Sequence, residues 1–517
     1  MATFNPDTVL LNWLIALPFF AAVAAELFPR LAMQVRSPKE AEALGRGPFP
    51  LGALTCAMGI AISSRLLSVA WSGTDVAADY WWTTDLYHLR LRADVLSSAL
   101  VLVIYGLGLL AFLHLGGVAV ARPAEPAAIP AGGLGTADRS HHRAALALVA
   151  VGAGAGAALA ADIVLMVFCL EVCVLAVCAL AWLDDAKRAG AMLVNGHLAG
   201  LLLALGVLLM WRQAAETSLE QLPFLLLPTG PGTLRAIALV ALLGLWPRVA
   251  GGVGYGLRST ASASAPRTGL LASPLLVVVA GAVLLRLLPG SLLLPTVPAL
   301  RAVSLIAGLL TLWKGAVRAW LSHELRARAG WLTVAQAGYL LVALAGAAAP
   351  DAPPAFLQAA CYQVVSAPVA VLALWLACSA VLERVGTDAL PGLSGLLPRL
   401  PSAALGLLVG GLSLVGLPGL AGFNVQRLLL SGILAEGSWP LAAAVVLTDV
   451  ALALIVLDTF RRVFLRGERP PAVRPGSVGL ALPLLVVTAL LILGGVWGGP
   501  LAQWSQSVSS KVLSFSP

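Results

Sequence analysis

The chain has 517 residues, of which 60% are hydrophobic and 11% charged, and its mean hydropathy is +0.94. This composition excludes an array of soluble domains, because their packing would leave large apolar surfaces in water. The net charge of +8 lies mostly between apolar segments, without a basic patch carrying interleaved aromatic residues. We therefore expect the lipid bilayer as the surroundings of the chain, and no nucleic-acid partner.

About fourteen apolar stretches are long enough to cross the hydrocarbon core, which takes roughly 20 residues. The first seven predicted spans are 8–29, 49–71, 93–121, 143–160, 161–183, 189–211 and 233–251. The next seven are 269–289, 297–321, 329–348, 354–383, 402–434, 440–464 and 478–497. The predicted fold class is therefore an all-α polytopic membrane protein with about 14 transmembrane helices.

Two of the predicted helices contain helix breakers. Pro247 and Gly251 interrupt the seventh, and Pro418 and Gly422 interrupt the twelfth. Inside a membrane, a break is tolerated only where the freed backbone faces protein or a water-lined cavity. Since the breaks lie five spans apart, we expect two inverted five-helix repeats, as in transporters with discontinuous helices.

This organisation divides the chain into four segments and leaves no room for a soluble domain. They are 1–121 with helices one to three, 143–289 with the first repeat, 297–464 with the second repeat, and 478–517 with the last helix and a C-terminal tail.

An ionisable side chain at mid-membrane costs about 2.5 to 3.5 kcal/mol even on the lenient insertion scale, so it requires a partner or a function. Glu171 lies in the middle of the fifth span, with uncharged residues on both sides, and cannot reach either surface. A desolvated carboxylate beside a cation can load and release a proton. The alternative is a neutral acid hydrogen-bonded to a backbone carbonyl.

Other ionisable residues are candidates for the same path. Arg248, at the break in helix seven, stays charged and would bias Glu171 or order water, unless it is an anchor at the interface. His197 could relay protons, although a packed histidine is the simpler interpretation. Lys314 and Asp449 are candidate members of a path through the second half.

Charges near the predicted helix ends are expected to be structural or interfacial. Arg326 and Arg328 are expected to anchor a loop against anionic headgroups. Asp458, Arg461 and Arg462 lie near the end of the thirteenth span and are interpreted as structural.

Several motifs resemble one family: the antiporter-like membrane subunits of complex I, related membrane hydrogenases and multisubunit cation/proton antiporters. HELRARAGWLTVAQAGY at 323–339 is similar, without a gap, to the run that opens the family's helix ten. LSLVGLPGLAGF at 412–423 resembles its broken helix twelve, and LRADVLS at 91–97 resembles the start of its helix three. The setting of Glu171 is similar to that of the key glutamate in helix five. The resemblance covers roughly residues 86–470.

The resemblance implies two proton half-channels joined by a central row of buried lysines. Most of that row is replaced here. The lysine of helix seven becomes Arg248, that of helix eight becomes Val279, and that of helix eleven becomes Ser366. The Lys or Glu of helix twelve becomes Gln426. Either the path is rebuilt from other residues, Glu171 among them, or this member has lost pumping.

The family implies a proton-translocating, antiporter-like subunit of a complex I-like energy-coupling assembly in a prokaryotic cytoplasmic membrane. Its partners would be other membrane subunits, and it would carry protons or cations. The alternatives are a degenerate, non-pumping scaffold, or an ion-coupled subunit of a cation/proton antiporter or an inorganic-carbon uptake system. The short segment after the last span resembles the family's shorter subunits.

No cofactor, metal or catalytic centre is expected in the chain itself. The six cysteines fall in apolar segments without C-x-x-C spacing, and no nucleotide-binding loop or haem-ligand pair is present. If the assembly is an NADH or ferredoxin:quinone oxidoreductase, partner subunits would handle the electrons.

Overall fold

The computed structural model of the protein describes most of the chain. The described residues are 6–34, 47–83, 87–121, 140–184, 186–214, 218–219, 221, 233, 266–287, 298–349, 351–465, 472–474 and 478–514. The predicted seventh helix lies outside these residues apart from Thr233, and with it Pro247, Arg248 and Gly251.

Helices make up nearly all of the described structure. The N-terminal part forms α1 (Pro6–Gln34), α3 (Pro48–Trp71), α4 (Val95–Ala121), α5 (Ser140–Leu159), α6 (Ile163–Asp184), α7 (Ala186–Ala214) and α11 (Pro266–Leu287). The C-terminal part forms α12 (Pro298–Leu321), α13 (Leu325–Ala347), α14 (Pro354–Val385), α15 (Pro401–Val415), α16 (Phe423–Ala435), α17 (Trp439–Phe460), α18 (Val478–Val496) and α19 (Gly499–Ser514). Two short turns, η3 (Leu390–Gly392) and the π-helical η4 (Arg461–Leu465), complete this part.

Within the described ranges, 12 helices are long and apolar enough to cross a membrane. They correspond to predicted spans one to six, eight to eleven, thirteen and fourteen, and α15 and α16 together occupy the predicted twelfth span. The polytopic helical class is thereby confirmed. The inverted repeats stay a prediction.

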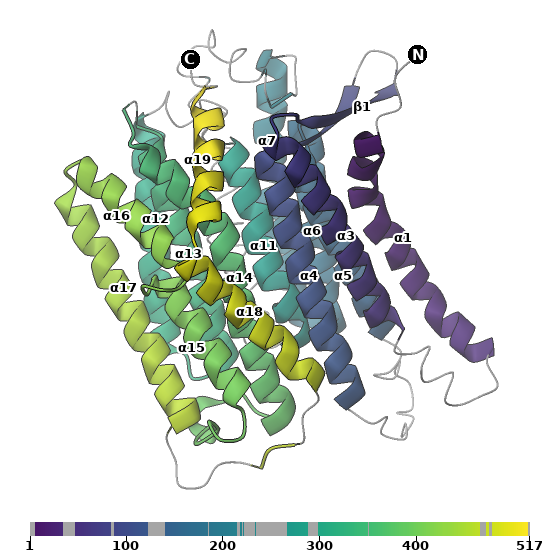
Figure 1. Cartoon of the computed structure of the whole chain (residues 1–517), viewed down its shortest axis with the longest axis vertical. Coiled ribbons are helices and arrows are strands. Elements are labelled where there is room, and N and C mark those ends of the chain that lie inside the picture. The colour runs from purple at the N-terminus through teal and green to yellow at the C-terminus, as the bar shows by residue number, and fades with distance from the viewer. Residues whose placement is uncertain are drawn as a thin grey trace.

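The helices form one bundle, with the N-terminal part and the C-terminal part side by side (Figure 1). In this view the purple and blue helices α1 to α7 occupy the right, and the green helices α12 to α17 occupy the left. Between them, α11 packs against α4, α5 and α14, and α18 runs diagonally to contact α4, α14 and α15. The helices α11 and α18 therefore both connect the two parts.

The all-α prediction omits one antiparallel hairpin, β1 (Val76–Thr83) and β2 (Tyr87–Ala93). It ends at Asp94, whose Oδ1 accepts the Ser97 backbone N–H at 2.7 Å and so caps α4. Burial alone would raise the pKa of Asp94, but Arg286, 4.0 Å away, and the Ser97 hydrogen bonds hold that pKa below its usual value. The hairpin thus leads directly into α4, whose first turn Asp94 caps.

The start of α13 corrects one expectation about the basic loops. Nε of Arg326 lies 2.6 Å from Oδ2 of Asp388, and Nη1 of Arg328 lies 3.1 Å from Oδ2 of Asp458. Arg328 is buried, so neither arginine is an anchor for lipid headgroups. A guanidinium at a helix end binds a carboxylate of a neighbouring element more readily than a distant headgroup when packing brings that carboxylate within reach. The structural interpretation of Asp458 agrees with this contact.

Between α15 and α16 the chain leaves the helical path where the sequence predicts a broken helix. Gly416 and Gly419 adopt φ values of +86° and +87°, which favour glycine. The Gly422 backbone N–H donates to Oγ of Ser413 at 3.2 Å, and this bond satisfies part of the freed backbone. Pro418 lies within the turn. The interruption therefore exposes polar backbone inside the bundle, next to α13 and α14.

The C-terminal segment is helical where only a tail is expected. The helix α19 packs against α4 and α14, and Nε1 of the buried Trp504 donates to the Val95 carbonyl at 3.1 Å. The buried Trp504 and Val508 lie one turn apart, so one face of α19 packs against the bundle.

Candidate functional site

The C-terminal part of the bundle encloses a chain of buried polar side chains that begins at Asp449 of α17. The hydroxyl of Tyr339, on α13, donates a hydrogen bond to the Asp449 carboxylate. The side chain of Gln426, on α16, lies near the same hydroxyl. Tyr339 is fully buried, and Asp449 is half-buried. One carboxylate is therefore hydrogen-bonded to a buried, uncharged hydroxyl that lies near an amide.

Gln426 lines the same cavity as a second group of amides, Gln336 and Gln363. Nε2 of Gln363, on α14, donates to both the carbonyl oxygen and the side-chain oxygen of Gln336, at 3.0 Å each. Nε2 of Gln336 in turn donates to the Leu414 carbonyl, in the last turn of α15 before the break, at 3.2 Å. The broken helix thus supplies a backbone acceptor to the chain, which an unbroken α15 would keep for itself.

A small cavity joins these groups. Its volume is about 10 Å³, and its polar lining consists of Gln336, Gln363, Ser366, Ser413 and Gln426. This volume corresponds to room for about one water molecule. Oε1 of Gln426 is buried and has no hydrogen-bond partner among the described residues. A water in the cavity would satisfy that oxygen, because a buried acceptor without a partner costs about 1 to 3 kcal/mol.

A second cavity, of about 20 Å³, extends from the same amides toward the centre of the molecule. Gln336 and Gln363 lie on one side, and Val277 and Ala280 of α11 lie on the other. The two cavities share the glutamine pair, so the polar groups reach from α17 across α13 and α14 to α11. Each cavity holds only one or a few water molecules at its present size.

The polar side chains around the cavity carry no fixed charge, and they interact through hydrogen bonds. Serine, tyrosine and glutamine side chains stay neutral near pH 7, and their hydroxyl and amide groups both donate and accept hydrogen bonds. Such groups orient water without holding an ion. Asp449 supplies a carboxylate next to groups that can order water.

The other predicted site residues lie apart from this chain or outside the described residues. Glu171 is half-buried on α6, and His197 is exposed on α7. Lys314 is exposed on the face of α12 that also carries Trp313. The position of Arg248 lies outside the described residues. Asp449 is the predicted residue that the structure connects to buried polar groups.

The positions that the resemblance assigns to the family's central row have two kinds of surroundings in this structure. Ser366 and Gln426 both line the 10 Å³ cavity. Val279, by contrast, is fully buried on α11, and a Cβ atom built on Gly154 of α5 would lie 2.9 Å from its Cγ2 atom. Val279, the replaced position of the first half that the structure describes, is therefore packed against a helix, whereas the two in the second half face a polar space.

Sequence reasoning does not single out Tyr339, Gln336 or Gln363. A signal is present for the first two, because they are the polar residues of the QAGY tetrapeptide within the helix-ten motif. That motif is evidence of resemblance and does not by itself mark site residues. Gln363 lies in an apolar stretch of α14 and becomes significant only through its two hydrogen bonds to Gln336.

Sequence comparison relates the chain to known membrane proteins. Residues 160–451 match a family model described as NADH:quinone oxidoreductase/Mrp antiporter, transmembrane. NADH-quinone oxidoreductase subunit N of Heliobacterium modesticaldum is 31% identical over 256 residues, which are 48% of this chain and 52% of that protein. One subunit of the Na(+)/H(+) antiporter of Bacillus subtilis is 28% identical over 153 residues, which are 28% of this chain and 31% of that protein. The chain thus spans about half the length of the first relative, and less of the second.

Solved structures resemble the fold over nearly the whole chain. A chain of the Mrp complex from Dietzia sp. aligns with a TM-score of 0.80 at 17% identity, covering 98% of both chains. A chain of respiratory complex I from Thermus thermophilus aligns with a TM-score of 0.78 at 19% identity, covering 98% of this chain and all of that one. At these identities the likeness concerns the fold.

Proposed function

Because the chain belongs to the NADH:quinone oxidoreductase/Mrp antiporter transmembrane family, we propose that it is a proton-translocating, antiporter-like membrane subunit of a complex I-like energy-coupling assembly. Its partners are other membrane subunits, and it resides in the cytoplasmic membrane of a prokaryote. Support for these partners comes from the solved structures with the same fold, which include an Mrp complex and respiratory complex I.

The observation that carries the proposal is the buried hydrogen bond from Tyr339 to Asp449, with Gln426 and its cavity next to it. A scaffold would need only apolar packing at this depth, because a polar side chain in the membrane interior must recover its lost hydration. The polar cavity is instead lined by Ser366 and Gln426, two positions where the resemblance puts ionisable residues. In the proposed step, Asp449 exchanges a proton with the cavity water through the Tyr339 hydroxyl.

The proposed path has a second titratable group in the N-terminal part. Glu171 lies on α6 and would load a proton there. His197 would relay the proton, and Arg248 would bias Glu171 or order water. Lys314 would serve the outer end of the path in the C-terminal part, from the exposed face of α12. The two groups of residues would belong to the two five-helix repeats.

A non-conducting scaffold is the second candidate function, and the surroundings of Val279 favour it. A tightly packed valine at the helix-eight position leaves no space for water between α5 and α11 at that point. The similarity to a subunit of an Na(+)/H(+) antiporter supports cation/proton exchange as a further candidate function.

Proton uptake by vesicles that contain the purified assembly tests the proposal. Asp449→Asn and Glu171→Gln each remove a carboxylate while nearly preserving volume. We expect each change to lower coupled proton uptake by at least about tenfold, in line with the effect of removing a positioned proton-transfer group. The complex should stay assembled in both variants.

Asp351→Asn is the matched control, because Asp351 is an exposed acid in the loop between α13 and α14. This change removes the same charge from a solvated site and should leave proton uptake at the native level. If all three variants pump like the native assembly, the chain is a scaffold and the proposal fails.

A further inference from the structure

The adjacent ends of α1 and α5 carry a cluster of side chains that the proposed proton path does not use. Glu26 lies in the last third of α1, and His141 and His142 lie in the first turn of α5. Nδ1 of His142 is 2.9 Å from Oε1 of Glu26, and Nε2 of His141 is 3.7 Å from Oε2 of Glu26. The two imidazole rings lie 4.0 Å apart between their centroids. One carboxylate and two imidazoles thus converge from two helices.

We propose that Glu26, His141 and His142 form a binding site for a divalent transition-metal ion such as Zn²⁺. One carboxylate oxygen and one ring nitrogen of each histidine all lie within 4.8 Å of one another. Zn²⁺ binds imidazole nitrogen at about 2.0 to 2.1 Å and carboxylate oxygen at about 2.0 to 2.2 Å, so tetrahedral ligands lie about 3.4 Å apart. Small side-chain rotations bring the three donor atoms to that spacing.

The donor set selects the class of ion. Imidazole nitrogen suits Zn²⁺, Cu²⁺ and Ni²⁺, whereas Mg²⁺ and Ca²⁺ require several oxygen ligands that this cluster does not supply. Three protein ligands leave a fourth position for water or a small anion. The ion would replace the proton that Glu26 and His142 share, and it would use Nδ1 of His142 and Nε2 of His141.

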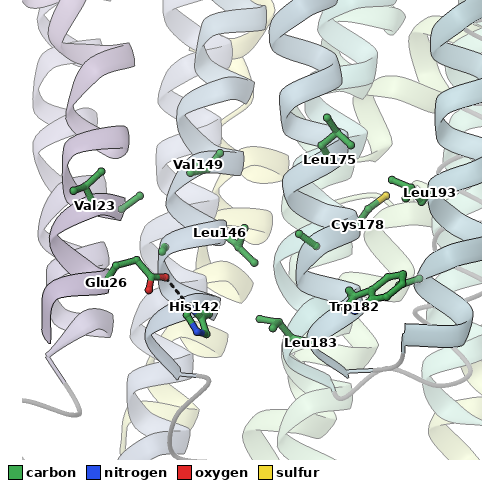
Figure 2. A pocket seen from close by; sticks show the side chains of 14 residues that line it. Val23, Glu26, His142, Leu146, Val149, Leu175, Cys178, Trp182, Leu183 and Leu193 are labelled. Atoms are coloured by element: carbon green, nitrogen blue, oxygen red, sulfur yellow. Dashed lines mark hydrogen bonds and ion pairs between the residues drawn. The ribbon is translucent and has the colours of Figure 1, made fainter. Parts of the chain in front are cut away.

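Space for the ion and its fourth ligand is present. A groove of about 620 Å³ opens beside the cluster, between α1, α5, α6 and α7. Figure 2 shows Glu26 and His142 joined at one side of this groove, with the apolar side chains of Leu146 and Trp182 also lining it. The side chains of Glu26 and His142 are 39% and 45% exposed, whereas His141 is 9% exposed. The site is therefore open to solutes on one side and supported by protein on the other.

The electrostatic surroundings are compatible with a metal ion. Glu26 supplies one negative charge, and neutral imidazoles add none. A bound ion would tie α1 to α5 near the end of both helices.

Zinc titration of the full chain in lipid nanodiscs tests the site, with the metal competed against a chromophoric chelator. We expect one Zn²⁺ per native chain. Glu26→Gln, His141→Gln and His142→Gln should each weaken binding by at least about tenfold, because losing a ligand costs more than losing an outer-shell partner. His323→Gln is the control, since His323 is exposed in the loop before α13 and should leave the affinity unchanged.

Zinc X-ray absorption on the native chain gives a readout that needs no variant. Histidine scattering with nitrogen and oxygen ligands at about 2.0 to 2.1 Å supports the site. The proposal is overturned if the native chain binds no stoichiometric Zn²⁺, if the bound ion shows no histidine ligands, or if the cluster variants bind like the His323→Gln control. None of these results depends on proton transport.

Discussion

Val279 in the N-terminal part and Gln426 in the C-terminal part occupy positions where the resemblance puts a basic or acidic side chain, yet their surroundings differ. Val279 packs against Gly154 between α11 and α5, with no polar side chain in the contacts described at that position. Gln426 reaches Tyr339 and a cavity that it shares with Ser366. The same loss of charge is therefore accommodated by apolar packing in one place and by neutral hydrogen-bonding groups in the other.

The helix break explains this difference. In the unbroken helix α11 the backbone groups bond within the helix, so nothing next to Val279 demands a polar side chain. Between α15 and α16 the backbone is interrupted, and the Leu414 carbonyl accepts from Gln336. A freed carbonyl in the bundle interior requires a donor, so polar side chains persist there after the ionisable ones are gone. The comparison predicts different tolerance of substitution in the two places.

Restoring lysine at the two positions should produce the largest effect. Val279→Lys buries an unpaired cation at a cost of about 2.5 to 3.5 kcal/mol, and overpacking against Gly154 adds about 1 to 3 kcal/mol. Gln426→Lys places the ammonium beside a cavity and a carboxylate-linked tyrosine, and should cost less than half as much. Unfolding midpoints in a graded detergent series measure both. Equal costs would show that the two positions do not differ in the way described.

An intermediate effect is expected from the packing of α5 on α11. Gly154→Ala puts a methyl group 2.9 Å from Cγ2 of Val279 and should destabilise the fold by about 1 to 3 kcal/mol. Val279→Ala removes that atom, so the double variant should recover part of the loss. A double-mutant cycle on the unfolding free energy gives the coupling. Purely additive costs would mean that another neighbour takes up the strain.

In the C-terminal part, Gln363→Leu tests the amide pair. Leucine approximates the volume of glutamine but leaves Oε1 of Gln336 without its donor, at a cost of about 1 to 3 kcal/mol in unfolding free energy. We expect proton uptake by the assembled complex to fall as well, because the amides orient the cavity water. Gln363→Asn keeps an amide donor there and should retain more of the uptake than leucine does. A native uptake rate with leucine would remove the amide pair from the proposed path.

Ser366→Ala should have the smallest effect on stability. Its hydroxyl donates to the Tyr362 carbonyl one turn earlier, a bond at 2.8 Å that helps the helix little. We expect a change in unfolding free energy within about 0.5 to 1 kcal/mol. Thermal unfolding monitored by circular dichroism measures it. A loss well above this range would indicate that the hydroxyl holds the cavity water as well.

The membrane helices and the second break are predictable from the sequence because both depend on local properties. Length and hydropathy locate spans, and clustered Gly and Pro at 416–422 locate an interruption. The hairpin before α4 and the helix α19 are harder to predict from the sequence. The first is visible only as a strand-like segment, and the second depends on the contact of Trp504 with α4, which a local pattern does not contain.

The site is predictable only in part, because sequence reasoning looks for charge. Asp449 stands out for its carboxylate in an apolar span, but the amides that accompany it are neutral and ordinary in a sequence. Gln363 and Gln336 come together from α14 and α13 through tertiary packing. Glu171 is the most prominent candidate in the sequence, and its role stays a prediction.

The central claim is that protons pass along the buried chain from Asp449 to the cavity, and Tyr339→Phe tests it most directly. This change removes the hydroxyl that donates to Asp449 and lies near Gln426, and it keeps the aromatic ring that packs α13. Proton uptake by vesicles containing the assembled complex should fall by at least about tenfold, with assembly unchanged. Uptake at the native rate in the phenylalanine variant would contradict the account, because removing the Tyr339 hydroxyl would then not affect proton uptake.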